Sequence, residues 1–246
     1  MTDKAEAPRI LQLSDYKWFR ARKLESAPAD QAELIVRRLG LQDYEPIWKS
    51  MRYRAEHPPK NNTDEIWLLS HKPVYTQGQA GKPEHIVKPG KIAVVQIDRG
   101  GQVTYHGPGQ LVVYLLLDVR QRKLSVRDLV ELIERTITET LDRLEIPGKT
   151  RARAPGIYVD DAKIAALGLR IKNGCSYHGL SLNVDMDLSP FANINPCGFK
   201  GLEVTQIADF VEQKEHLMQS VSNILLDRLL QNLGYEIQTH RKLKSD

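Results

Sequence analysis

This sequence of 246 residues lacks several features that would point to other classes of protein. It has only two cysteines, which argues against a disulfide framework and fits a reducing cytosol. Its longest apolar run, residues 111–117, is far shorter than the roughly 20 residues that cross a bilayer, so we expect no membrane-spanning helix. Residues 1–6 carry both signs of charge without an apolar core, so we expect no secretory signal.

The chain also lacks a strong charge of one sign and the common nucleotide and serine-hydrolase motifs. Lys and Arg number 35 against 31 Asp and Glu, a formal net charge of +4, and they are spread along the chain. We therefore expect no nucleic-acid or membrane partner, although a mildly basic surface favours acidic protein partners through steering. The glycine-rich segment 99–110 does not end in Gly-Lys-Ser/Thr, and the sequence has no Gly-x-Gly-x-x-Gly fingerprint and no Gly-x-Ser-x-Gly elbow.

Hydrophobic periodicity predicts one α/β (α+β) domain over residues 31–240, after a flexible extension over residues 1–30. Helices are expected to open at Asp43, to run from Ser125 to about Leu144, and to cover residues 217–229. Ser125 and Asp128 have the spacing of a capping box. Expected strands are residues 34–39, 65–70, 92–97, 111–117, 156–159, 163–171 and 175–184, with turn-rich segments at 76–83 and 99–101 and a hairpin turn at residues 160–161.

Cys197 is the first candidate for chemistry, because it lies on a rigid Asn-Pro-Cys-Gly turn rather than inside an apolar element. Lys163 precedes it by 34 positions and is followed by the small, apolar segment 164–169. Burial beside such residues would lower the pKa of a lysine and let it accept a proton. A thiol with a lysine as its base suggests acyl transfer through a thioester rather than proteolysis.

Other readings of these residues stay open at this point. His71, His106 and His178 are alternative bases for the thiol, so a Cys-His hydrolase is a second possibility. Cys175 reads as a structural residue at the start of a strand. A zinc site built from both cysteines with His106 and His178 would have only one Cys-x-x-His pair, half of a usual ligand set, so we expect no metal.

The segment Arg99–Gln110 holds four glycines in twelve residues. Glycines in pairs let backbone N–H groups approach the polar atoms of a ligand. The alternative interpretation is structural, with two turns on either side of a short strand. Composition alone does not separate the two.

Taken together, these motifs resemble the lipoyl(octanoyl) transferases of lipoate biosynthesis. The resemblance covers roughly residues 34–210 in unbroken order. It rests on residues 71–79, 99–110, 154–159, 163–171, 178–184 and 195–198. Ala165, Ala166 and Ser181 depart from some relatives, which affects the shape of an acyl pocket but not the reacting groups. The extension before residue 30 lies outside the resemblance.

The resemblance implies a mixed central sheet flanked by helices, as in the lipoate and biotin protein ligase catalytic domains. It also implies transfer of an octanoyl group from octanoyl acyl carrier protein to a lysine of a lipoyl domain, in 2-oxoacid dehydrogenase complexes or the glycine cleavage H protein, with no cofactor. Cys197 would hold the acyl group and Lys163 would activate the thiol. Family substrate-binding segments correspond to Arg99, Gly100, Gly101, Gln102, Val103, Thr104, Tyr105 and His106, to Ala166, Leu167 and Gly168, and to Gly179, Leu180 and Ser181.

Two other functions remain as alternatives. An ATP-dependent lipoate or biotin ligase of similar architecture would need no thiol nucleophile, and the missing nucleotide motif argues against it. A non-catalytic binder of carrier protein would leave the thiol and the lysine without a role. For direct proton transfer we predict that the Lys163 Nζ lies within about 4 Å of the Cys197 Sγ.

Overall fold

The computed structural model describes residues 16–27, 32–59, 63–152, 154–196 and 201–237. Its strands are β1 (Lys17–Lys23), β2 (Leu34–Gln42), β3 (Asp64–His71), β4 (Val74–Gln77), β5 (Ala93–Gln96), β6 (Val103–His106), β7 (Gln110–Leu116), β8 (Lys149–Thr150), β9 (Ile157–Val159), β10 (Ala162–Lys172), β11 (Cys175–Asn183) and β12 (Tyr235–Glu236). Its helices are α1 (Tyr44–Glu56), α2 (Val126–Asp142) and α3 (Leu217–Asn232), with short 3₁₀ segments η2 (Pro83–His85), η3 (Ser189–Asn193) and η5 (Ile207–Asp209).

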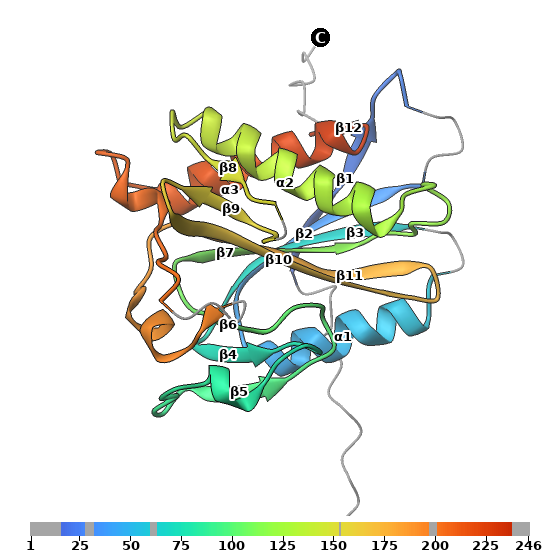
Figure 1. Cartoon of the computed structure of the whole chain (residues 1–246). Helices are drawn as coiled ribbons and strands as arrows, with labels where there is room; N and C mark the ends of the chain where they lie inside the picture. Colours follow the sequence, from blue (N-terminus) through green and yellow to red (C-terminus); the bar gives the residue numbers. More distant parts are fainter. Residues whose placement is uncertain (1–15, 28–31, 60–62, 153, 197–200, 238–246) are drawn as a thin grey trace, which may run out of the picture.

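The centre of the molecule is a mixed sheet, which runs across the middle of Figure 1. In the described residues its strands follow the order β12-β1-β2-β3-β7-β11-β10-β9-β8. Only β2 and β3 pair in parallel there, and the other neighbours are antiparallel. A smaller sheet has the order β5-β4-β6. Strand β7 is buried along its whole length, as expected for a strand that is covered on both faces of its sheet.

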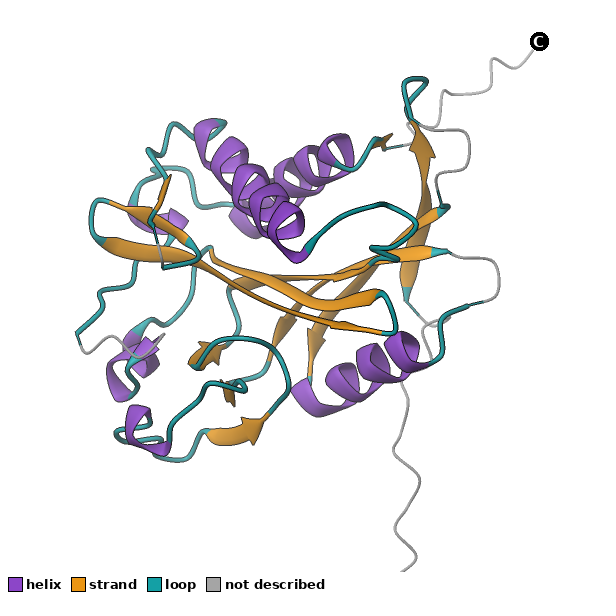
Figure 2. Ribbon diagram, turned by 45° about the vertical axis from the view of Figure 1, so that its right-hand side comes forward, coloured by secondary structure: helices purple, strands orange, loops and turns teal. Residues whose placement is uncertain are grey.

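The two faces of the large sheet carry different layers, and both views show them (Figures 1 and 2). Helices α2 and α3 cover one face and form the main hydrophobic core with it. Helix α2 contributes Leu129, Ile133, Ile137 and Leu141, which share one side of the helix because they recur every four residues. Helix α1 and the small sheet lie on the other face, where a second core forms around Trp67 and Tyr114.

Several of the expected elements are confirmed. The Ser125 hydroxyl accepts a hydrogen bond from the Asp128 backbone N–H, and the Asp128 carboxylate accepts one from the Ser125 N–H, so the predicted capping box opens α2. The hairpin of β9 and β10 turns at Asp160, whose φ of 49° is left-handed. The glycine-rich segment 99–110 is two turns around the short strand β6. The predicted strand 111–117 corresponds to β7.

Three expectations differ from the structure. The interpretation of residues 1–30 as a poorly ordered extension is wrong for β1, which pairs with β2 on one side and with β12 on the other. Thr76 and Gln77, assigned to a turn-rich segment, end strand β4. Helix α2 ends at Asp142, one turn or less before the expected end at Leu144. The division into an extension and a single domain over residues 31–240 otherwise stays a prediction.

Candidate active site

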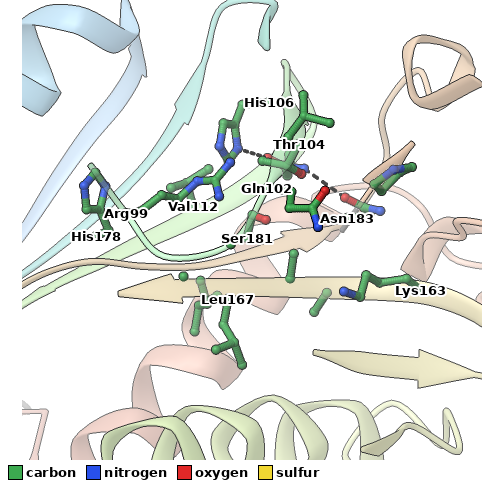
Figure 3. A pocket seen from close by; sticks show the side chains of 18 of the residues that line it. Arg99, Gln102, Thr104, His106, Val112, Lys163, Leu167, His178, Ser181 and Asn183 are labelled. Atoms are coloured by element: carbon green, nitrogen blue, oxygen red, sulfur yellow. Dashed lines mark hydrogen bonds between the residues drawn. The ribbon is translucent and has the colours of Figure 1, made fainter. Parts of the chain in front are cut away.

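A cavity of about 70 Å³ lies between the large sheet and the segment that carries β6. Strands β10 and β11 form one wall, with Ala166, Leu167, Gly168 and Leu180 among its apolar residues. The lining is mostly apolar, with polar groups at a few points (Figure 3). A small apolar cavity with a few converging polar groups is typical of a site for a small ligand.

Lys163 lies on this cavity wall and is almost completely buried, with 4% of its surface exposed. Its Nζ donates a hydrogen bond to the Pro155 carbonyl oxygen at 3.0 Å and lies 5.2 Å from the centre of the Tyr158 ring. Its backbone is held from the other side, because the Lys163 N–H donates to Glu203 O and the Lys163 carbonyl accepts from Thr205 N–H. The lysine is therefore fixed both along its backbone and at its amine.

Gly156 makes room for this lysine. It has a φ of 130°, and a Cβ built at this position would lie 2.8 Å from Lys163 Cε and 2.6 Å from Ala165 O. Any side chain at Gly156 would therefore displace the amine or the strand that carries it. The Gly156 N–H donates to the Glu134 carboxylate of α2, which ties the turn to the helix layer.

The turn from Arg99 to Gln102 closes over the cavity through backbone hydrogen bonds. Gly78 N–H donates to Gln102 O, Ala80 N–H donates to Gly101 O, and Gly100 N–H donates to Leu169 O of β10. Gly78 packs so closely that an added Cβ would lie 2.4 Å from Gly101 O. The sequence left two interpretations of these glycines open, a structural turn and a backbone that approaches a ligand. Both hold, because the glycines form a turn and that turn places its backbone against the cavity.

A chain of hydrogen bonds starts at this turn and follows the wall of the cavity. The Arg99 guanidinium donates to the Thr76 hydroxyl at 3.0 Å, and Thr76 Oγ1 lies 3.4 Å from His106 Nε2. His106 Nδ1 lies 2.7 Å from the Gln110 Oε1. Because an amide oxygen only accepts, His106 carries its proton on Nδ1 and accepts from Thr76 at Nε2.

The chain continues to the strand that flanks Lys163. Gln110 Nε2 donates to Asn183 Oδ1 at 3.0 Å (Figure 3), and Asn183 Nδ2 donates to Thr205 O at 2.9 Å. Thr205 N–H in turn donates to the Lys163 carbonyl. Each of these groups has its orientation set by its neighbours, so the polar wall of the cavity is rigid.

Two buried histidines near this wall are neutral. Burial lowers the pKa of His71 to about 4, and the hydrogen bond to Gln42 O only partly opposes this shift. Burial, reinforced by the neighbouring His71, lowers the pKa of His106 to about 3. His71 donates from Nδ1 to Gln42 O and accepts at Nε2 from the Tyr114 hydroxyl, 2.7 Å away.

The structure brings most of the predicted site residues to one cavity. Its lining includes Lys163 together with Arg99, Gly101, Gln102, Val103, Thr104, His106, Ala166, Leu167, Gly168, Leu180 and Ser181. Gly100, Tyr105 and Gly179 support the wall from behind: Tyr105 packs against Phe191, and a Cβ at Gly179 would lie 2.1 Å from Val113 O. Cys197 lies outside the described residues, and Pro196, the residue before it, lines the cavity.

Cys175 and the histidines do not gather into a metal centre in the described ranges. No cluster of three or more His, Cys, Asp or Glu side chains occurs there. Cys175 begins β11 and packs against the core around Trp67 and Tyr114, and burial raises the pKa of its thiol. Also within those ranges, none of the helices combines the length and the hydropathy needed to cross a membrane.

Comparison with known proteins identifies the family. Residues 43–230, more than half of the chain, match the model of the lipoyl protein ligase A/B catalytic domain. The chain belongs to this family. An octanoyltransferase of Hahella chejuensis is 54% identical over 87% of this chain and 95% of its own length. An octanoyltransferase of Vibrio atlanticus is 52% identical over 84% of this chain and 93% of its own length.

Solved structures of lipoate protein ligases share the fold. A lipoate-protein ligase A bound with ATP has a TM-score of 0.66 at 14% identity, over 85% of this chain and 87% of its own. The bi-partite lipoate protein ligase of Thermoplasma acidophilum has a TM-score of 0.61 at 16% identity, over 80% of this chain and 83% of its own. The expected mixed sheet with flanking helices, as in the lipoate ligases, is confirmed.

Several residues of this site have no motif that predicts them from the sequence. Thr76, Gln110 and Asn183 carry the hydrogen-bond chain, yet uncharged amides and hydroxyls have no spacing that marks them in a sequence. Tyr44 belongs to α1 and lines the cavity because the fold brings this helix next to the other lining residues, which are distant from it in the sequence. Asp98 was also missed, although it directly precedes Arg99 and is bonded to His178.

Proposed function

We propose that this family member transfers an octanoyl group from octanoyl acyl carrier protein to the ε-amine of a lysine on a lipoyl domain. Cys197 carries the acyl group as a thioester, and Lys163 moves the protons. The observation that carries the proposal is the shared cavity: the buried amine of Lys163 and Pro196, the neighbour of Cys197 in the chain, line the same apolar space. The relatives at about half identity bear the name octanoyltransferase, which supports the same activity.

The proposed reaction has two acyl-transfer steps. In the first, Lys163 takes the thiol proton, the Cys197 sulfur attacks the thioester carbonyl, and the thiol of the carrier protein leaves with that proton. In the second, the amine of the acceptor lysine attacks the Cys197 thioester. The amide bond forms, the carbon–sulfur bond breaks, and the amine proton returns through Lys163 to the sulfur. Neither step needs ATP, because a thioester is exchanged for a thioester and then for a more stable amide.

The apolar wall provides the binding energy for the acyl tail. An octanoyl tail has about seven methylene and methyl carbons, and their burial contributes between about 5 and 6 kcal/mol at ~0.8 kcal/mol each. The side chains of Ala165, Ala166 and Gly168 are small, so they leave room for an acyl chain against this wall. Backbone N–H groups beside Cys197 are the donors that we propose for the tetrahedral oxyanion.

We propose lipoyl domains of 2-oxoacid dehydrogenase complexes and the glycine cleavage H protein as acceptors. The reaction belongs in the cytoplasm in this proposal, because a reducing compartment keeps the Cys197 thiol free.

Transfer can be tested directly with octanoyl acyl carrier protein and a purified lipoyl domain. The wild type should form the octanoyl-lysine amide without ATP, and Cys197→Ala should abolish it. Cys175→Ala is the matched control, and it should retain transfer. Ligation of free octanoate by Cys197→Ala in the presence of ATP would instead establish the ATP-dependent ligase reaction and refute the proposal.

A further inference from the structure

One peptide group connects the Lys163 amine to helix α2. Its carbonyl oxygen belongs to Pro155 and accepts a hydrogen bond from Lys163 Nζ at 3.0 Å. Its N–H belongs to Gly156 and donates to Glu134 Oε1 at 3.1 Å. A peptide bond is planar and almost always trans, so its carbonyl and its N–H point in opposite directions. The lysine amine and the glutamate carboxylate are therefore bonded to the two sides of one rigid group.

This peptide needs an anchor, because Gly156 lets the backbone turn. Gly156 has a φ of 130°, in a region that only glycine adopts readily. Since glycine has few steric limits on φ, the peptide before it can rotate and carry the Pro155 oxygen away from the amine. The Glu134 carboxylate opposes this rotation, because a fixed N–H also fixes the carbonyl in the same plane.

Glu134 itself is fixed by the helix layer. It lies in the middle of α2, next to Ile133, which is fully buried in the main hydrophobic core. Helix α2 packs against β9 and β10, the strands that carry the ends of this site (Figure 1). Glu134 is not among the residues that line the cavity in the described ranges, so we expect it to act on the amine from behind the wall.

Two effects strengthen the bond to the lysine. A hydrogen bond from an N–H to a carboxylate is roughly twice as strong as one between neutral groups. Hydrogen bonds on the two sides of one peptide also polarise each other, so the Pro155 oxygen becomes a better acceptor for the amine. Figure 3 shows the Lys163 amine directed along the wall toward the other labelled side chains.

We propose that Glu134 is a positioning residue for Lys163 and acts through the Pro155–Gly156 peptide. The inference rests on the proposed function, in which Lys163 moves the protons. The amine nitrogen is tetrahedral, so one N–H fixed on the Pro155 oxygen also sets the directions of its other positions. One of these positions receives the thiol proton in the first step. A misdirected amine would slow this step without weakening the binding of the acyl donor.

Single-turnover transfer from octanoyl acyl carrier protein tests this difference. In Glu134→Ala the maximal rate should fall about 10- to 100-fold, the cost of a small displacement of a reacting group, while the donor concentration for half-maximal rate stays within about two-fold of wild type. Glu134→Gln should keep the rate within about five-fold of wild type, because its amide oxygen accepts the same hydrogen bond without the charge.

The matched control is Glu131→Ala, which makes the same change on the same helix. The Glu131 carboxylate is exposed and bonds to Arg127, away from the peptide. Its loss should leave the maximal rate within about two-fold of wild type, because the geometry of the amine does not change. If Glu134→Ala does not fold, Glu134→Asp replaces it, because aspartate keeps the charge but is too short to hold the Gly156 N–H, and the same fall is expected.

An NMR readout tests the position of the amine without catalysis. The two ε-protons of Lys163 have different surroundings while the side chain is fixed, so they should give separate signals in the wild type, identified by their absence in Lys163→Met. In Glu134→Ala the two signals should converge, because exchange between rotamers averages them. In Glu134→Gln and in Glu131→Ala they should stay separate.

Either of two results in Glu134→Ala would overturn the inference: a maximal rate within about two-fold of wild type, or ε-proton signals that stay separate. An equal fall in Glu131→Ala would also overturn it, because the helix and not the Gly156 bond would then be responsible. Failure of the proposed function gives a different result. The wild type would then form no octanoyl-lysine amide, while the NMR signals would still show whether Glu134 holds Lys163.

Discussion

The two neutral histidines beside the cavity predict a loss of stability in mild acid. A histidine whose folded pKa is lowered stabilises the fold above its unfolded pKa of about 6.5, and this contribution is lost as the pH falls, because the unfolded chain binds the proton first. With folded pKa values of about 4 for His71 and about 3 for His106, each group loses about 2 kcal/mol between pH 7.5 and pH 5. Together they lose about 4 kcal/mol, a large part of the usual stability of a domain.

Urea denaturation followed by tryptophan fluorescence at several pH values between 7.5 and 5 measures this change. His71→Gln and His106→Gln should each remove about 2 kcal/mol of the pH dependence, whatever they cost at pH 7.5. His216→Gln is the control, because its side chain is 81% exposed. The reasoning is refuted if the free energy of unfolding changes by less than about 1 kcal/mol over this range, or if His216→Gln flattens the profile as much as the other two.

Three further changes test single features. Lys163→Met should lower the rate of octanoyl transfer by about 10²- to 10⁴-fold in a single-turnover assay, the usual worth of a general base, and a rate within two-fold of wild type would contradict its role. Gly179→Ala should cost about 3 kcal/mol in urea denaturation, because its Cβ would lie 2.1 Å from Val113 O, and an unchanged midpoint would contradict this packing. Ser125→Ala should cost about 1 kcal/mol by the same measurement, since Asp128 N–H loses its acceptor, whereas no change would show that the capping box contributes nothing.

The elements with strong local signals were the predictable part of the fold. Helix α2 has a capping box and four core residues at helical spacing, so its start could be placed to the residue. Strand β7 has an apolar run that only a strand covered on both faces would need. In both cases the local sequence and the tertiary environment favour the same structure.

Strand β1 could not be predicted, because its own sequence is mostly charged and its side chains are largely exposed. It is a strand because β2 and β12 supply its hydrogen-bond partners, and β12 begins more than 200 residues later. Strand β4 was not predicted, for a related reason. It ends in Thr76 and Gln77, which resemble the turn that follows them, and it forms only by pairing with β5 and β6.

The residues of the site also separate into those that the sequence predicts and those that depend on tertiary contacts. Lys163 and the glycine-rich turn stand out by residue type and by resemblance to a family, and the structure places them on one cavity. The proximity of the Cys197 thiol to the Lys163 amine remains a prediction. The polar wall through Gln110 and Asn183 depends on contacts between residues 73 positions apart, which no local pattern reports. The orientation of His178 depends on a left-handed φ that a non-glycine residue adopts only under tertiary constraint.

The central claim is that Cys197 holds the acyl group during transfer. It is tested by mixing the wild type with octanoyl acyl carrier protein in the absence of an acceptor, quenching with acid, and mapping the modified peptide by mass spectrometry. The account predicts one octanoyl adduct on Cys197, which is lost in Cys197→Ser and discharged when a lipoyl domain is added. An adduct on Cys175, or full transfer to the lipoyl domain by Cys197→Ser, would contradict it.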